Sequence, residues 1–428
     1  MGLFSNIGRM FNRAPEPARP ARAPLPYPVK DLEAHLEPDG RKRILSLDGG
    51  GVRGAMSIAV LERIEDILRA RHGGHPDFRL CDYFDLMGGT STGSIIAAGL
   101  AAKRMTARDI AAMYDELAGK VFKKRFLTIG GAARSKFDAK NLRKQLEGVF
   151  ADMPLGDPSI ATGYAAVAKR IDTVSPWVLH NNPRGRFFQD PVDNAFRGNR
   201  HFPLTSVVRA STAAPTYFKP ERIEIAPGQF GEFIDGGMTP HNNPAFQMLM
   251  LAGLEGHNFN WTLNADRLSM ISIGTGSMVE KSVSKPGLLG RMVGGLPGAK
   301  AMKALMSMIS SSEDFIELLM QWASESVDPG AIDSEIGDLA RDLIGGAPLL
   351  AYERYQCRLN ATYLRAELGL NLTDKQLKTV QDMADPDAVP IARDIGLAMA
   401  ERLVREEHFP TRFDLTHQDT PTAPEPTA

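Results

Sequence analysis

Short apolar runs along the chain are followed by longer segments with helical periodicity. Arg43–Leu47 is a short apolar run, and Met56–Arg71 follows it with aliphatic residues every three to four positions. Tyr83–Met87 is a second apolar run, followed by the small-residue segment Gly93–Ala102. This alternation predicts an α/β fold with a central, mostly parallel sheet between two layers of helices.

The same patterns continue towards the C-terminus. They predict further strands at Tyr164–Asp172, Glu232–Ile234 and Leu268–Ile273, and further helices at Thr106–Leu117, Asp138–Phe150 and Ser312–Ser324, with two more inside Leu372–Arg405 that are interrupted near Pro386.

Composition divides the chain into four parts. Residues 1–28 are expected to be a flexible basic segment, because 14–28 consists almost entirely of Ala, Pro and Arg. Residues 40–280 form the predicted catalytic α/β domain. Residues 281–408 are predicted to hold a mobile basic segment and C-terminal helices that complete or extend this domain, and 409–428 are expected to be a disordered Pro- and Thr-rich tail.

Two basic segments are candidates for peripheral membrane contact. Residues 1–30 carry five basic side chains and one acidic one, and Met1–Arg13 has apolar residues at helical spacing. Val283–Met308 is rich in Gly and Met, and residues 281–310 hold five basic residues and no acidic one. The alternative for the first is a frayed terminus. For the second, the alternative is that its apolar side chains pack against the C-terminal helices as ordinary core.

Charge and cysteine content exclude several classes of protein. The 428 residues hold 50 basic and 51 acidic side chains, a net charge of −1, so no global positive field favours nucleic acid. The two cysteines, Cys81 and Cys357, have neither disulfide-scaffold nor zinc-site spacing. No apolar stretch reaches the roughly 18 residues of a spanning helix. We therefore expect a cytoplasmic protein, with the membrane contact peripheral.

The segment Gly89–Gly93, with the sequence GTSTG, lies where a predicted strand turns into a helix. In this setting small flanking residues allow a sharp turn that exposes the serine hydroxyl, while the helix start offers free amides. Ser91 is thus the candidate nucleophile, and the amide of Thr92 is a candidate donor to a developing oxyanion.

A second glycine-rich turn, Asp48–Gly54 with the sequence DGGGVRG, also follows a strand and opens a helix. Its amides at Gly49, Gly50 and Gly51 are candidates for the remaining oxyanion donors. Arg53 is a candidate support for a substrate phosphate, and its alternative role is an ion pair with Asp48.

The same turn fits GxGxxG, the pattern of a nucleotide-binding module. That alternative expects an acidic residue after the next strand, where the chain has Ser91 instead, and leaves the serine unexplained.

Asp235 is the candidate base, because it ends a short strand and is followed by two glycines. A Ser-His-Asp esterase acting on small soluble esters is the rival hydrolase. His241 lies six residues beyond Asp235, and other histidines follow, so counting alone leaves this triad open. No pair of histidines shows metal-ligand spacing such as HExxH.

The order DGGGVRG, GTSTG and DGG (Asp235–Gly237) resembles the three signatures of patatin-like phospholipases. Supporting similarity lies at 209–218, 242–244 and 272–276, so the resemblance spans about Arg43 to Gly276.

The resemblance implies a patatin-like three-layer fold and a Ser91–Asp235 dyad that works without histidine, metal or cofactor. It also implies that phospholipid or lysophospholipid acyl esters are the substrates. Because some members of the family are regulated, an activator that the sequence does not identify is a further candidate partner.

Overall fold

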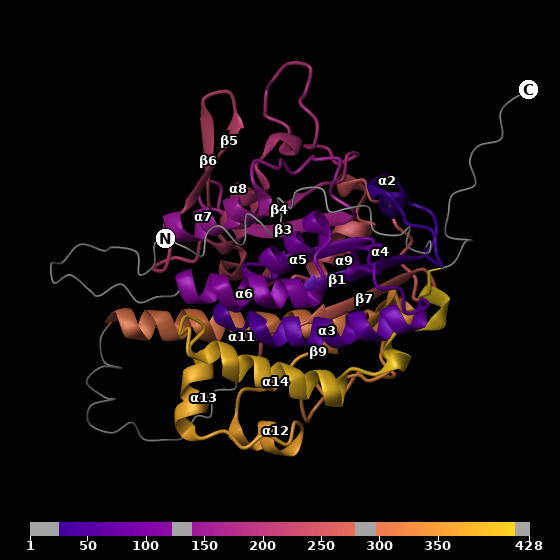
Figure 1. The fold of residues 1–428 in the computed structure, drawn as a ribbon, viewed down its shortest axis with the longest axis vertical. Coiled ribbons are helices and arrows are strands. Elements are labelled where there is room, and N and C mark those ends of the chain that lie inside the picture. Colours follow the sequence, from indigo (N-terminus) through magenta and orange to yellow (C-terminus); the bar gives the residue numbers. More distant parts are fainter. Residues whose placement is uncertain (1–24, 122–138, 279–296, 416–428) are drawn as a thin grey trace, which may run out of the picture.

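A computed structural model of the chain describes residues 25–121, 139–278 and 297–415. The described residues form one mixed sheet with helices packed on both faces (Figure 1). The sheet order is β5-β6-β3-β2-β1-β7-β9-β8, and β4 also pairs with β3. The strands are β1 (Lys42–Leu47), β2 (Leu86–Thr90), β3 (Gly163–Arg170), β4 (Ser175–His180), β5 (Glu221–Ala226), β6 (Gln229–Asp235), β7 (Leu268–Ile273), β8 (Ser324–Glu325) and β9 (Leu350–Tyr355).

The central strands β3, β2, β1, β7 and β9 run parallel, so their carboxyl ends meet at one edge of the sheet. Every residue of β1, β2 and β7 is buried, which explains why these strands are rich in apolar residues at both even and odd positions. The strands β4, β5 and β6 add an antiparallel extension beside β3.

Alternate side chains of the strands fill two separate cores, one on each face of the sheet. The longer helices are α3 (Gly54–Arg71), α5 (Thr92–Lys103), α6 (Ala107–Val121), α7 (Ala139–Phe150), α8 (Leu204–Thr212), α9 (Ala245–Gly253), α11 (Pro297–Trp322), α13 (Asp374–Gln381) and α14 (Ala388–Leu403); the short ones are α2 (Leu32–Leu36), α4 (Leu80–Tyr83) and α12 (Ala361–Ala366). Leu45 belongs to the core that includes residues of α3, α5, α6 and α14, whereas Ile44 belongs to the core that includes residues of α9 and α11.

The second strand begins later than its sequence pattern predicts. Tyr83 ends the one-turn helix α4, because the Asp82 carboxylate accepts the N–H of Arg79 and stabilises that turn. The strand then continues through Gly88 and Gly89. A side chain at Gly88 would lie 2.2 Å from the Met248 sulfur of α9, so the glycine permits close packing.

The C-terminal part belongs to the same layered unit. The sequence pattern predicts no strand beyond Ile273, yet β9 pairs with β7 over most of its length. Helix α14 lies against α3 (Figure 1), at a contact where a side chain on Gly396 would come within 2.6 Å of the Met56 backbone. The C-terminal part thus extends the sheet through β9 and packs α14 onto helix α3.

Two predicted boundaries are displaced. Tyr27, inside the segment expected to be flexible, is buried and packs edge-on against Phe78. Phe409 and Phe413, inside the expected tail, are also buried, and the described chain continues to Leu415. Buried apolar side chains therefore attach the chain to the fold before the predicted boundary at residue 28 and after the predicted boundary at residue 408. Residues 1–24, 279–296 and 416–428, which include most of the predicted membrane segments, lie outside the described residues.

Candidate active site

Ser91 occupies a sharp turn between β2 and α5. Its φ of 52° is in the left-handed region, which is rare for a residue with a side chain. A side chain at Gly93 would lie 2.2 Å from the Leu47 carbonyl oxygen, and one at Gly89 would meet the backbone of Gly93 at the same distance. Both glycines are therefore required for the turn that exposes the serine hydroxyl.

Strand pairing brings Asp235 to this turn. Thr90 at the end of β2 pairs with Val167 of β3, and the next β3 residue, Ala168, pairs with Asp235 at the end of β6. Although Ser91 and Asp235 are far apart in the sequence, the two residues lie two strands apart at the same edge of the sheet.

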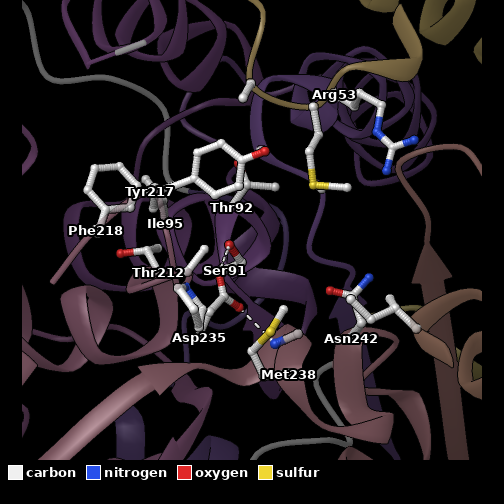
Figure 2. Close-up of a pocket in the computed structure, with 18 of the residues that line it drawn as sticks. Arg53, Ser91, Thr92, Ile95, Thr212, Tyr217, Phe218, Asp235, Met238 and Asn242 are labelled. Carbon is white, nitrogen blue, oxygen red and sulfur yellow. Dashed lines mark hydrogen bonds between the residues drawn. The ribbon is translucent and has the colours of Figure 1, made fainter. Parts of the chain in front are cut away.

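The two side chains are in direct contact. The Ser91 hydroxyl donates a hydrogen bond to Asp235 Oδ2 over 2.7 Å, and the Gly237 N–H donates to Oδ1 over 2.7 Å (Figure 2). Asp235 is 4% exposed. Burial raises the pKa of Asp235 from 3.8 to about 6, against the opposing effects of these two hydrogen bonds and of Arg209. The carboxylate is thus more basic than an exposed aspartate.

Histidine does not line this cavity in the described part of the chain. His241 borders a different groove, between α9 and α11, and its backbone carbonyl accepts the Thr90 hydroxyl over 2.6 Å. His241, which the triad hypothesis proposes as the base, is therefore close to Asp235 in the sequence but lines a different groove from the one that holds Ser91.

The glycine loop offers fewer free amides than the sequence predicts. The Gly49 N–H donates to the Asn242 carbonyl over 3.1 Å, so our assignment of Gly49 to the oxyanion hole is wrong. The Val52 N–H is likewise used by the Met383 carbonyl, at 2.9 Å. Gly50 and Gly51 line the cavity, with Gly51 at a φ of 56°.

Thr92 also lines the cavity. As the first residue of α5 it has an N–H among those that a helix start leaves without a helical partner. The candidate oxyanion donors are therefore Gly50, Gly51 and Thr92.

Arg53 lines the same cavity and is 5% exposed. Within the described residues, its Nε and Nη1 have no hydrogen-bond partner. The alternative of an ion pair with Asp48 does not occur, because Arg354 of β9 donates to both Asp48 oxygens, at 2.8 and 2.5 Å. No sequence motif indicates this partner, which lies about 300 residues further along the chain.

Comparison with known proteins places this site in a family. Residues 45–249 match the family model described as patatin-like phospholipase. A cGAMP-activated phospholipase of Escherichia coli (strain TW11681) is 32% identical over 221 residues, which cover 51% of this chain and 57% of that protein. Patatin-T5 of Solanum tuberosum is 27% identical over 252 residues, which cover 55% of this chain and 61% of that protein.

A third relative aligns with this chain over a larger share of the relative's own length. A cUMP-AMP-activated phospholipase of Escherichia coli is 32% identical over 255 residues, which cover 58% of this chain and 68% of that protein. The chain belongs to the patatin-like phospholipase family. The three-layer fold around the sheet agrees with this membership, although the chain spans less than two thirds of several of these relatives.

Residues beyond the three signatures also build the site of this family member. Ser211 of α8 accepts the Ser91 N–H over 2.9 Å and donates to the Val167 carbonyl over 2.6 Å, which fixes the backbone of the candidate nucleophile to β3. The similarity at 209–218 contains this residue, but the pattern does not indicate its role. Met383 and Glu313 lie outside the region matched by the family model and still line the cavity.

The cavity has two chemically different ends, with Ser91 and Asp235 between them (Figure 2). Ile95, Tyr217 and Phe218 lie at one end, and Arg53 and Asn242 lie on the opposite side of the serine. Further apolar lining comes from Leu117, Val121 and Leu142. Such an arrangement can hold an apolar chain on one side of a scissile bond and a charged group on the other.

Two absences apply to residues 25–121, 139–278 and 297–415. No cluster of three or more His, Cys, Asp or Glu side chains is arranged there as a metal site. None of the helices in these parts of the chain combines the length and apolarity needed to cross a membrane.

Proposed function

We propose that this chain is a phospholipid acyl hydrolase of the phospholipase A or lysophospholipase type. The observation that carries the proposal is the 2.7 Å hydrogen bond from the Ser91 hydroxyl to buried Asp235, beside candidate oxyanion amides and an apolar cavity. The names of the bacterial relatives and the family membership support a lipid substrate.

In the proposed reaction, Asp235 takes the Ser91 proton while Oγ attacks the ester carbonyl carbon. The amides of Gly50, Gly51 and Thr92 stabilise the oxyanion that forms. When the intermediate collapses, the C–O bond to the lysophospholipid breaks, and Asp235 returns the proton to this leaving oxygen. Asp235 then takes a proton from a water molecule whose oxygen attacks the acyl carbon. When the bond from this carbon to Ser91 Oγ breaks, Asp235 returns the proton to Oγ and the fatty acid is released.

In this scheme the apolar end of the cavity receives the acyl chain and Arg53 meets the phosphodiester. A buried guanidinium with unpartnered nitrogens is suited to an anionic oxygen, because the ligand restores hydrogen bonds that burial has removed. The Asp48–Arg354 pair leaves Arg53 available for this role.

We also propose that access to this cavity is from a bilayer surface. Helix α11 exposes Met308 and Phe315, at 68% and 57%, while its Glu313 lines the cavity. Two exposed apolar side chains on a helix that also lines the cavity can contact a membrane next to the site. This role supports the peripheral location that the sequence predicts.

Fatty-acid release tests the proposed function. Incubation with vesicles of mixed phospholipids should yield free fatty acid and lysophospholipid, detected by mass spectrometry. Because relatives are named for activation by cyclic dinucleotides, the assay is run with and without cGAMP and cUMP-AMP. Hydrolysis of small soluble esters only, under every condition, would favour the rival esterase.

The pH profile of this hydrolysis follows from Asp235. The base must be ionised to accept the serine proton, so the protonated form is inactive. With its pKa raised to about 6, kcat/KM should fall as pH drops through that value and level off above it. A soluble short-chain ester is the substrate for this measurement, because its own charge does not change with pH. A constant rate down to about pH 4 would contradict Asp235 as the base.

A further inference from the structure

Two opposite charges line the polar part of the cavity. Arg53 comes from the short helix that opens α3, and Glu313 comes from α11 on the other face of the sheet. Each contributes to the electrostatic environment of the other, yet among the described residues no ion pair within 4.0 Å joins them. The cavity therefore holds a cation and a carboxylate that do not neutralise each other by direct contact.

Glu313 is held in place by one of its two oxygens. Asn242 Nδ2 donates to Glu313 Oε1 and also lies 3.3 Å from the Gly49 carbonyl oxygen, so the carboxylate is tied to the glycine loop beside Ser91. For the second oxygen, Oε2, the described parts of the chain provide no hydrogen-bond partner. One oxygen is thus anchored, and the other is free to accept a hydrogen bond from a ligand.

The electrostatic setting of Glu313 favours a positive ligand. Burial, together with the negative charge of Asp48, raises the pKa of Glu313 to about 7, although Arg354 and Arg53 act in the opposite direction. A cation that enters the cavity beside the carboxylate would replace lost hydration and stabilise its ionised form.

The positive charge of Arg53 and the negative charge of Glu313 are complementary to a ligand that carries both an anion and a cation. An amine-bearing phospholipid headgroup carries a phosphodiester anion and an ammonium cation a few bonds apart. We propose that the cavity selects phospholipids with such zwitterionic headgroups, with the phosphodiester at Arg53 and the ammonium at Glu313. This proposal rests on the proposed function, because it assigns the headgroup of the lipid whose ester Ser91 attacks.

An anionic headgroup would be disfavoured at the same place. Phosphatidylglycerol offers a phosphodiester to Arg53 but only hydroxyl groups to Glu313, so the carboxylate remains without a cation. A charge-assisted hydrogen bond to an ammonium is stronger than one to a neutral hydroxyl. Discrimination should therefore appear between lipids that differ only in the headgroup.

The test compares phosphatidylethanolamine and phosphatidylglycerol with identical acyl chains, each diluted in neutral detergent micelles. At about pH 8, where Glu313 is ionised, the wild-type chain should show a kcat/KM ratio of about tenfold or more in favour of phosphatidylethanolamine. Glu313→Gln should reduce this ratio to near one. Asp314→Asn, which removes an exposed carboxylate one residue away, should keep the wild-type ratio.

The ratio is measured within one variant, so partial loss of folded protein does not change it, and Glu313→Asp should retain part of the preference. A wild-type ratio near one, or an unchanged ratio in Glu313→Gln, would overturn the headgroup proposal while leaving acyl hydrolysis standing. Failure of the wild-type chain to hydrolyse either lipid, both with and without cGAMP and cUMP-AMP, would overturn both.

Discussion

Asp235→Asn is expected to lower kcat for ester hydrolysis by about 10⁴-fold. The amide has nearly the same shape and can still accept the Gly237 N–H, so the turn after β6 should keep its structure. It cannot take the proton from Ser91, however, and the hydroxyl remains a weak nucleophile. Steady-state kinetics on a soluble ester, with circular dichroism to check folding, measures this effect.

His241→Ala is the matched comparison. Its backbone carbonyl, which accepts the Thr90 hydroxyl, is kept in the variant, and only the imidazole is lost. Because this ring borders the groove between α9 and α11, kcat should stay close to the wild-type value. If the imidazole were the base of a triad, its removal would cost several orders of magnitude in kcat. An inactive His241→Ala beside an active Asp235→Asn would therefore favour the triad.

Gly51→Ala should lower kcat by about 10²- to 10³-fold through damage to the oxyanion donors. Gly51 has a φ of 56°, and an added Cβ would lie 2.1 Å from the Met383 carbonyl oxygen. The same oxygen accepts the Val52 N–H and belongs to the backbone, so the clash can be relieved only if the glycine loop moves. The candidate oxyanion donors Gly50 and Gly51 would then be displaced from their places in the cavity wall.

Gly40→Ala separates this effect from backbone strain. Gly40 has a φ of 85°, but a Cβ there would meet nothing within 4 Å. Gly40→Ala should lose about 1 to 2 kcal/mol of stability from the left-handed conformation alone, as measured by thermal unfolding. Gly51→Ala should lose more, because its Cβ also clashes with the Met383 carbonyl oxygen. Only Gly51→Ala should lose catalysis, and equal kcat in the two variants would argue against the glycine loop as an oxyanion site.

The sequence predicts those parts of the fold that depend on a local pattern, namely the buried strands and the glycine turns. Buried parallel strands read as apolar runs, so β1 and β7 are located to within one residue. The turn around Ser91 can be recognised in the sequence, because Gly89 and Gly93 lie at close backbone contacts that a larger residue would prevent. The sequence pattern does not predict β9, because nothing local shows that Leu350–Tyr355 joins the sheet beside β7.

For the site, the motifs identify Ser91 and Asp235 as candidates, and strand pairing determines that they meet. The pattern could not show that Asn242 already occupies the Gly49 amide, since this depends on the fold of a distant loop. The partner of Asp48 was hidden for the same reason, because Arg354 reaches it only through β9. Glu313 likewise lies on a helix whose sequence does not indicate that one face borders the cavity.

The most direct test of the central claim is covalent labelling of Ser91. The wild-type chain is treated with a fluorophosphonate, in which the serine oxygen displaces fluoride from phosphorus, and the labelled peptide is identified by mass spectrometry. We predict one label on Ser91, retained in His241→Ala and strongly slowed in Asp235→Asn. A label on another residue, or labelling of Ser91 that depends on His241 and not on Asp235, would contradict the dyad.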